Sequence, residues 1–148
     1  MNSCAAALCA LAQRHGGGRG GADFVMVYLC EAHASDEWPI GLAALGIEVC
    51  AHRCLAERRS AAEAMLARLP LREHGFTVCL DLIGKKMEEE DNPFDRAMPS
   101  WPFRFWVVQH GRIALRANLK NGGKQLDLSE LEHWLEKRRK ASSGQCDE

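Results

Sequence analysis

The spacing of hydrophobic and polar positions changes along the chain, and it predicts a series of helices and strands. Residues 3–15 are rich in Ala and Leu, contain no helix breaker and end at a run of glycines, which predicts a helix. Residues 24–29 are a short apolar run of largely β-favouring residues, typical of a strand buried on both faces. A helix followed by a buried strand is the order expected of an α/β sheet.

The middle of the chain repeats this order. From about residue 53 to residue 69, apolar residues recur at helical spacing, charged residues occupy the other face, and Pro70 marks the end. The apolar face comprises Leu55, Ala62, Met65, Leu66 and Leu69, and the charged face Glu57, Arg58, Arg59 and Arg68. Residues 76–80 predict a second buried strand, and the charged, Pro-containing residues 85–100 predict a surface loop or insertion.

The last third of the chain predicts a hairpin and a helix. Residues 103–109 and 112–117 flank His110 and Gly111, which favours two antiparallel strands joined by a two-residue turn. The final helix is expected to begin at Asp127, whose carboxylate can cap its first turn, and to end near residue 140. Its buried stripe comprises Leu128, Leu131, Trp134 and Leu135.

The predicted order is helix, strand, helix, strand, strand, strand, helix. This order matches a thioredoxin-like α/β fold, a mixed sheet flanked by helices, if one strand is supplied before residue 1. We therefore expect one thioredoxin-like domain over residues 1–140 that lacks its first active-site strand. The small, polar residues 141–148 are expected to form a disordered tail.

Composition narrows the possible functions. A chain of 148 residues has the length of one domain, and its 19 basic and 20 acidic residues leave a net charge of -1, which disfavours nucleic acid or membrane surfaces as partners. No apolar stretch approaches the roughly 20 residues that a membrane-spanning helix needs. The seven cysteines are odd in number and irregularly spaced, so we expect reduced thiols and a cytoplasmic location.

One string after the first predicted strand carries the most specific signal. Residues 30–38 read Cys-Glu-Ala-His-Ala-Ser-Asp-Glu-Trp. This string resembles the iodothyronine deiodinase signature Glu-Glu-Ala-His-Ala-Ser-Asp-Gly-Trp: Glu31 to Asp36 match without a break, and Trp38 matches again. The resemblance continues at lower density over roughly residues 5–139, through His52, Asp81, the Trp101-Pro102 pair and the hairpin residues 109–113.

The resemblance implies a thioredoxin-like enzyme that removes iodine reductively from the rings of thyroid hormone. Such enzymes use a selenocysteine, or a cysteine in some relatives, and take electrons from thiols. The implied partners are therefore an iodinated or otherwise halogenated aromatic molecule and a thiol reductant that acts as co-substrate, with no bound cofactor. Related enzymes pair through their folds, so a homodimer is also expected.

This chemistry assigns roles to residues of the matching string. The attacking selenol or thiol must be anionic, and the ring carbanion left by iodine must receive a proton, so a nearby imidazole serves both steps. His33 is the first candidate, because it lies just beyond the carboxyl end of a strand, where ligands of open α/β sheets bind. Glu31 could orient this imidazole or relay its proton. His52 is a second candidate relay or substrate contact.

Other residues are candidates for binding the substrate. Trp38 belongs to the signature, and Pro102 precedes a strand at the position of the thioredoxin-fold cis-proline, where its backbone would line the pocket. The loop in which the family tends to carry Gly-Arg-Gly-Pro reads Lys-Asn-Gly-Gly-Lys here, so Lys120 and Lys124 would supply positive charge with less directional hydrogen bonds.

Each of these residues also has a purely structural interpretation. His33 could be an ordinary polar loop residue, and His52 an exposed helical histidine. Asp36 could merely cap a following turn, and Trp38 could belong to the core.

The segment that carries the selenocysteine in the family, of the type Gly-Ser-Cys-Thr-Sec-Pro, has no match in the chain. Because selenocysteine is encoded by a codon normally read as stop, our hypothesis is that Met1 is a false start. An upstream reading frame without an in-frame UGA or Cys codon close to Met1 would refute it. Within the chain, Cys4 lies nearest the beginning of the first predicted helix and is a weak substitute nucleophile. Cys30 is either a resolving thiol or a core residue.

Three other functions remain open at this stage. The same fold could reduce peroxides or disulfides, or it could be a redox-inactive module that only binds a ligand. A metal site is disfavoured: Cys50 and Cys54 share one helical face, but His52 would point to the opposite side and no second ligand pair is evident.

Overall fold

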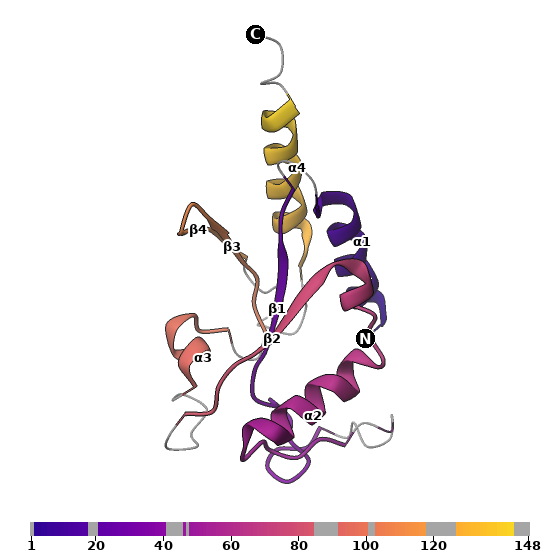
Figure 1. Cartoon of the computed structure of the whole chain (residues 1–148), viewed down its shortest axis with the longest axis vertical. Helices are drawn as coiled ribbons and strands as arrows, with labels where there is room; N and C mark the ends of the chain where they lie inside the picture. The colour runs from indigo at the N-terminus through magenta and orange to yellow at the C-terminus, as the bar shows by residue number, and fades with distance from the viewer. Residues whose placement is uncertain are drawn as a thin grey trace. The chain divides into compact units, whose positions relative to one another are not determined.

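A computed structural model of the chain describes residues 2–17, 21–40, 46, 48–84, 92–100, 103–117 and 127–143. Helices and strands follow one another in the predicted order, with a short helix inside the predicted insertion (Figure 1). The predicted mixed α/β class is confirmed. No helix among these residues is long and apolar enough to cross a membrane. The elements are α1 (Asn2–His15), β1 (Phe24–Tyr28), α2 (Leu55–Leu66), the 3-10 helix η2 (Arg72–His74), β2 (Phe76–Leu80), α3 (Pro93–Ala97), β3 (Trp106–Gln109), β4 (Arg112–Arg116) and α4 (Ser129–Ser143).

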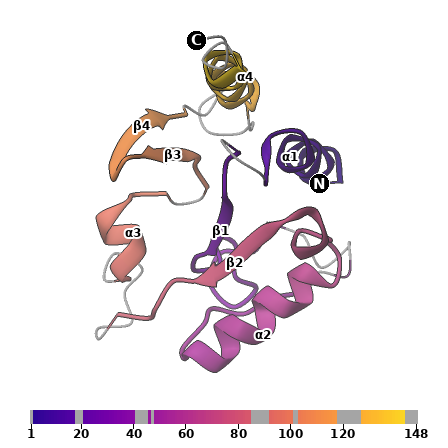
Figure 2. The same ribbon diagram turned by 45° about the horizontal axis from the view of Figure 1, so that its top comes forward.

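Strands β1 and β2 pair with each other (Figure 2). The rings of Phe24 and Phe76, the first residues of the two strands, have centroids 5.4 Å apart. At the other end, the Asp81 amide donates to the Tyr28 carbonyl at 3.0 Å, so the strands run parallel and their carboxyl ends meet. The prediction that both strands are buried on both faces is wrong. Val25 is 56% exposed, the other residues of β1 are only partly buried, and β2 alternates between partly buried and exposed positions, as expected of a strand with one face toward solvent.

Strands β3 and β4 form an antiparallel hairpin, as predicted. His110 and Gly111 occupy its two-residue turn with φ values of 51° and 71°, the left-handed conformation that this type of turn requires. The register shifts between Val107 and Val108. The described strands thus form two separate two-stranded sheets, one parallel and one antiparallel, where the sequence predicted one mixed sheet.

The described residues belong to two compact units, and the first comprises 1–25, 71–77 and 103–148. Its core lies where α1 packs against α4 (Figure 1). Leu11 of α1 and Leu131 and Leu135 of α4 are buried there, and the predicted apolar stripe of α4 is confirmed. The Asp127 carboxylate accepts a hydrogen bond from the Ser129 amide at 3.0 Å, as expected of a residue that caps the first turn. Helix α4 continues to residue 143, beyond its predicted end, and residues 144–148 lie outside the described part.

The second unit comprises residues 26–70 and 78–102, and a buried arginine stabilises it. The sequence places Arg58 on the charged, exposed face of the helix, but its side chain is only 2% exposed, so this prediction is wrong. Its Nη1 donates to the backbone carbonyls of Asp81 at 2.8 Å and Leu82 at 3.2 Å, just after β2. These carbonyls supply acceptors for Nη1 and join α2 to the end of the strand, whereas the buried Nε of Arg58 has no hydrogen-bond partner among the described residues.

Asp81 also holds the short helix α3. Its buried carboxylate accepts hydrogen bonds from the amides of Phe94 at 2.8 Å and Asp95 at 3.0 Å, which are the first amides of that helix. The predicted surface insertion over residues 85–100 therefore contains a short helix that is hydrogen-bonded to Asp81, the residue after β2. Residues 85–91 lie outside the described part of the chain.

Candidate functional site

The signature string begins where β1 ends and folds as a compact turn. The amides of Glu37 and Trp38 donate to the carbonyl of Ala34 at 3.2 and 3.0 Å. The Ala34 side chain is buried. The turn therefore carries the side chains on either side of Ala34 at the carboxyl end of a parallel strand, the edge where α/β folds bind ligands.

Glu31 and His52, two predicted site residues, meet around Tyr28. The Tyr28 hydroxyl donates to Glu31 Oε2 at 3.2 Å, and the rings of Tyr28 and His52 have centroids 5.8 Å apart. Burial, and then the negative charge of Glu31, raises the pKa of Tyr28 far above its ordinary range, so its hydroxyl remains a proton donor at neutral pH.

Our sequence interpretation did not include Tyr28. A signal for it exists in the sequence: an aromatic hydroxyl at the last position of a strand, three residues before a signature glutamate. The burial that makes this hydroxyl part of the site depends on residues far along the chain, and the strand pattern does not reveal it.

His52 lies in the segment that precedes α2, and it is partly buried. The interpretation of His52 as an exposed helical residue is therefore wrong. Both of its ring nitrogens are buried and have no hydrogen-bond partner among the described residues. Burial, followed by the charge of Arg58, lowers its pKa below the ordinary value, while Glu31, Glu57 and Asp36 act in the opposite direction. The ring is therefore predominantly neutral at pH 7.

His33 lies against Trp38, with ring centroids 5.0 Å apart and the planes inclined by 60°. The alternative that Trp38 belongs to the core is wrong, because 61% of its surface is exposed. The Nδ1 atom of His33 is buried and has no hydrogen-bond partner in the described part of the chain. The pair thus presents an imidazole beside an exposed aromatic ring, a combination suited to an aromatic ligand.

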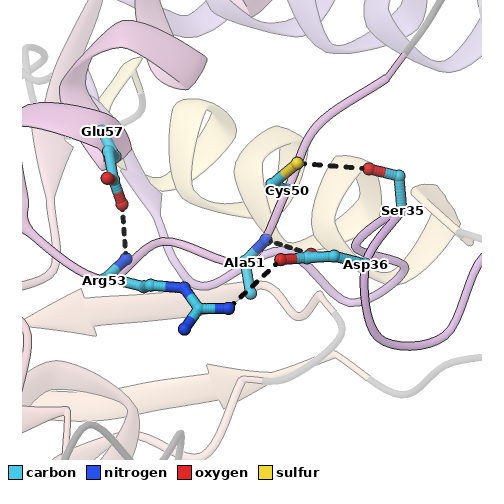
Figure 3. A network of polar contacts seen from close by, with 6 residues as sticks. All are labelled: Ser35, Asp36, Cys50, Ala51, Arg53 and Glu57. Carbon is cyan, nitrogen blue, oxygen red and sulfur yellow. Dashed lines mark hydrogen bonds and ion pairs between the residues drawn. The ribbon is translucent and has the colours of Figure 1, made fainter.

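A network of polar contacts ties the signature turn to the segment that contains His52 (Figure 3). Asp36 Oδ1 accepts from the Ala51 amide at 2.7 Å, and Asp36 Oδ2 lies 3.5 Å from Arg53 Nη2. The Ser35 amide donates to the Val49 carbonyl at 2.9 Å. The hydrogen bond from the Ala51 amide above all, and the Arg53 guanidinium, lower the pKa of Asp36. Asp36 therefore connects two segments that are distant in the sequence. The purely structural interpretation had assigned it only the role of capping a following turn.

The five described cysteines, at positions 9, 30, 50, 54 and 79, are free thiols. Cys30 follows β1 and is partly buried. The Cys50 thiol lies 3.4 Å from the Ser35 hydroxyl. Cys9 is buried in the first unit, and burial raises its pKa, which disfavours the reactive thiolate.

No group of three or more potential metal ligands occurs among the residues that the structure describes. Several predicted site residues cannot be placed. Pro102, Lys120 and Lys124 lie outside the described residues, as does the side chain of Cys4, whose backbone is part of α1.

Comparison with known proteins points to a single family. A family model described as iodothyronine deiodinase matches residues 19–139. The thyroxine 5-deiodinase of Sparus aurata is 34% identical over 118 residues, which are 80% of this chain and 39% of that protein. The type II iodothyronine deiodinase of Homo sapiens is 34% identical over 117 residues, 78% of this chain and 39% of that protein. The thyroxine 5-deiodinase of Gallus gallus is 31% identical over 115 residues, 78% of this chain and 39% of that protein.

The chain thus spans about two fifths of the length of the curated relatives that it matches. The family match includes the signature turn, Tyr28, His52 and Asp81, whereas α1 lies before its first residue. Since the match covers most of the chain, this protein belongs to the iodothyronine deiodinase family.

Proposed function

We propose that the protein is an oxidoreductase of the deiodinase type that removes iodine from an iodothyronine or a related halogenated aromatic molecule. The observation that carries this proposal is the cluster of Tyr28, Glu31 and His52 beside the signature turn, in a chain that matches the family over residues 19–139. A thiol reductant is the co-substrate, and no bound cofactor takes part. The free thiols of the described part support a reducing compartment such as the cytoplasm.

The reaction requires a nucleophile and a proton donor. A selenolate or thiolate attacks iodine, so a bond from the chalcogen to iodine forms while the carbon–iodine bond breaks. The electron pair left on the ring carbon takes up a proton, which gives the deiodinated ring. Two thiols then reduce the chalcogen–iodine bond, release iodide and become a disulfide, which restores the nucleophile.

We assign the proton transfers to the imidazoles of the site. His33 protonates the ring carbon, because its Nδ1 has no competing partner among the described residues and the exposed Trp38 beside it can stack on an aromatic ring. His52 is held neutral by burial, so it can accept a proton from the attacking selenol or thiol. Glu31 stabilises the charge that then develops on His52, and Tyr28 holds Glu31 in place.

The test is dithiothreitol-dependent release of iodide from an iodothyronine by the natural protein. The variant His33→Gln is expected to lose at least about a hundredfold in kcat, the lower end of what a general acid contributes. His133→Gln is the matched control, because His133 is exposed on α4 in the other unit and should leave the rate unchanged. Replacing each cysteine in turn with serine, Cys4 and Cys30 included, tests which thiols of the chain the reaction needs.

Two outcomes would refute the proposal. Faster turnover of peroxide or a disulfide than of any iodinated aromatic would identify a thiol or peroxide reductase. No iodide release, together with a higher melting temperature when the iodothyronine is added, would identify a module that only binds its ligand.

A further inference from the structure

The ring of His52 has no hydrogen bond to any described residue, so its position depends on packing and on the backbone that carries it. Neither ring nitrogen has a hydrogen-bond partner among the described residues, although both are buried. The ring lies against that of Tyr28 with the planes inclined by 41°, a contact that restrains its position but does not fix its rotation. The backbone on either side of His52 must therefore determine where the ring lies.

Both neighbours of His52 are bound by the same carboxylate. The Ala51 amide donates to Asp36 Oδ1 at 2.7 Å, and the Arg53 guanidinium lies 3.5 Å from Asp36 Oδ2. In Figure 3 the carboxylate of Asp36 points toward both groups, one oxygen toward each. The side chain of Asp36 thus binds the residues immediately before and immediately after His52.

Asp36 also belongs to the turn that carries His33, the other histidine of the site. It lies three residues after His33, inside the turn closed by the Ala34 carbonyl. The next residue back, Ser35, donates from its amide to Val49 and contacts the Cys50 thiol, so the two segments are joined at successive positions. A shift of the His52 segment relative to the His33 turn would break the bond to the Ala51 amide.

From this geometry we infer that Asp36 is a positioning residue that fixes His52 against Tyr28 and in register with the turn of His33. Its contacts lie at an exposed residue, where an ion pair contributes little to the free energy of unfolding. We therefore expect Asp36 to affect the position of His52 more than the free energy of unfolding, and experiments can measure the two effects separately. Its importance for turnover rests on the proposed function, but its effect on His52 does not.

The test compares two substitutions that differ in one property. Asp36→Asn keeps an oxygen that can accept from the Ala51 amide but loses the charge, whereas Asp36→Ala loses both. The charged groups that act on the His52 ring are Arg58 and Glu57 of α2, Glu31 after β1, and Asp36 itself. Loss of the negative charge alone lowers the pKa of His52 further.

The two variants are therefore expected to move the titration of His52 in opposite directions. In Asp36→Asn the pKa of His52 falls slightly, because the negative charge that raises it is lost. In Asp36→Ala the released segment exposes the ring to water, and its pKa rises toward the ordinary value of about 6.5. The measurement is the pH titration of the imidazole carbon resonances by NMR, with His52→Gln to assign the signal. Glu37→Ala, a change at the exposed neighbour, is the control and should leave the titration unchanged.

Turnover and amide exchange give further readouts. Hydrogen exchange of the Ala51 amide should accelerate in Asp36→Ala and stay slow in Asp36→Asn. Iodide release should fall on the order of tenfold to a hundredfold in Asp36→Ala, the cost of a displaced catalytic group, and should be largely retained in Asp36→Asn. Absence of iodide release from the unmodified protein would refute the proposed function, while the titration would still test the role of Asp36.

Two results would overturn the inference. A pKa of His52 that falls equally in both variants would mean that Asp36 acts by charge alone. Global unfolding of Asp36→Ala, seen in its circular dichroism, would mean that the carboxylate stabilises the fold as a whole.

Discussion

Removal of the Asp81 carboxylate is expected to destabilise the second unit strongly. Asp81 is 3% exposed, and its two oxygens accept hydrogen bonds from the amides of Phe94 and Asp95. The change Asp81→Ala removes both acceptors without altering the backbone carbonyl that receives Arg58. The effect should therefore report the side chain alone.

The magnitude follows from the two amides that are left without an acceptor. An unsatisfied buried donor costs about 1–3 kcal/mol, and a hydrogen bond to a charged group contributes about 1.5–3 kcal/mol. Two lost hydrogen bonds to the carboxylate add up to about 3–6 kcal/mol, a large fraction of the roughly 5–15 kcal/mol that stabilises a typical domain. Asp81→Asn keeps one acceptor oxygen, so it should cost about half as much.

Urea denaturation measures the loss, and hydrogen exchange of the two amides locates it. Exchange at Phe94 and Asp95 should accelerate in Asp81→Ala even if the two units unfold separately. Asp23→Ala is the control, because Asp23 is exposed and such changes cost at most about 0.5 kcal/mol. A loss below about 1 kcal/mol for Asp81→Ala, with unchanged exchange, would show that water satisfies these amides and would refute the reasoning.

Two further predictions concern the core of the first unit and the pH dependence of stability. Leu11→Ala should lower the free energy of unfolding by about 2–5 kcal/mol in urea denaturation, because Leu11 is 2% exposed and packs against two leucines of α4. Val25→Ala, at an exposed position, is the control, and an equally small loss in both variants would contradict this packing. Burial lowers the pKa of His52 and of His15, so the unfolded chain binds more protons than the folded protein in the window below their ordinary value of about 6.5. The free energy of unfolding should therefore fall as the pH drops from 7.5 to 5.5, and His52→Gln should reduce this fall; an equal fall in both proteins would refute the role of His52.

Sequence patterns sufficed wherever the determining contacts were local. The two-residue turn at His110 and Gly111 follows from the need for left-handed φ values at both positions, and the apolar stripe of α4 follows from helical spacing. The signature string likewise identified the turn that carries His33. In each case the physical cause lies within a few residues, so the pattern of neighbours is enough.

The burial of individual polar groups was decided by tertiary structure. Helical spacing placed Arg58 among exposed charges, but carbonyls that follow β2 offer its guanidinium buried acceptors. His52 was interpreted as an exposed helical residue, whereas its ring lies against Tyr28 and the segment that carries it is bound by Asp36, both distant in the chain. By itself, the sequence determined the order of elements and the chemistry available to the site. The tertiary structure decided which side chains contact one another and in which direction their pKa values shift, because the acceptors and charges involved come together only in the folded chain.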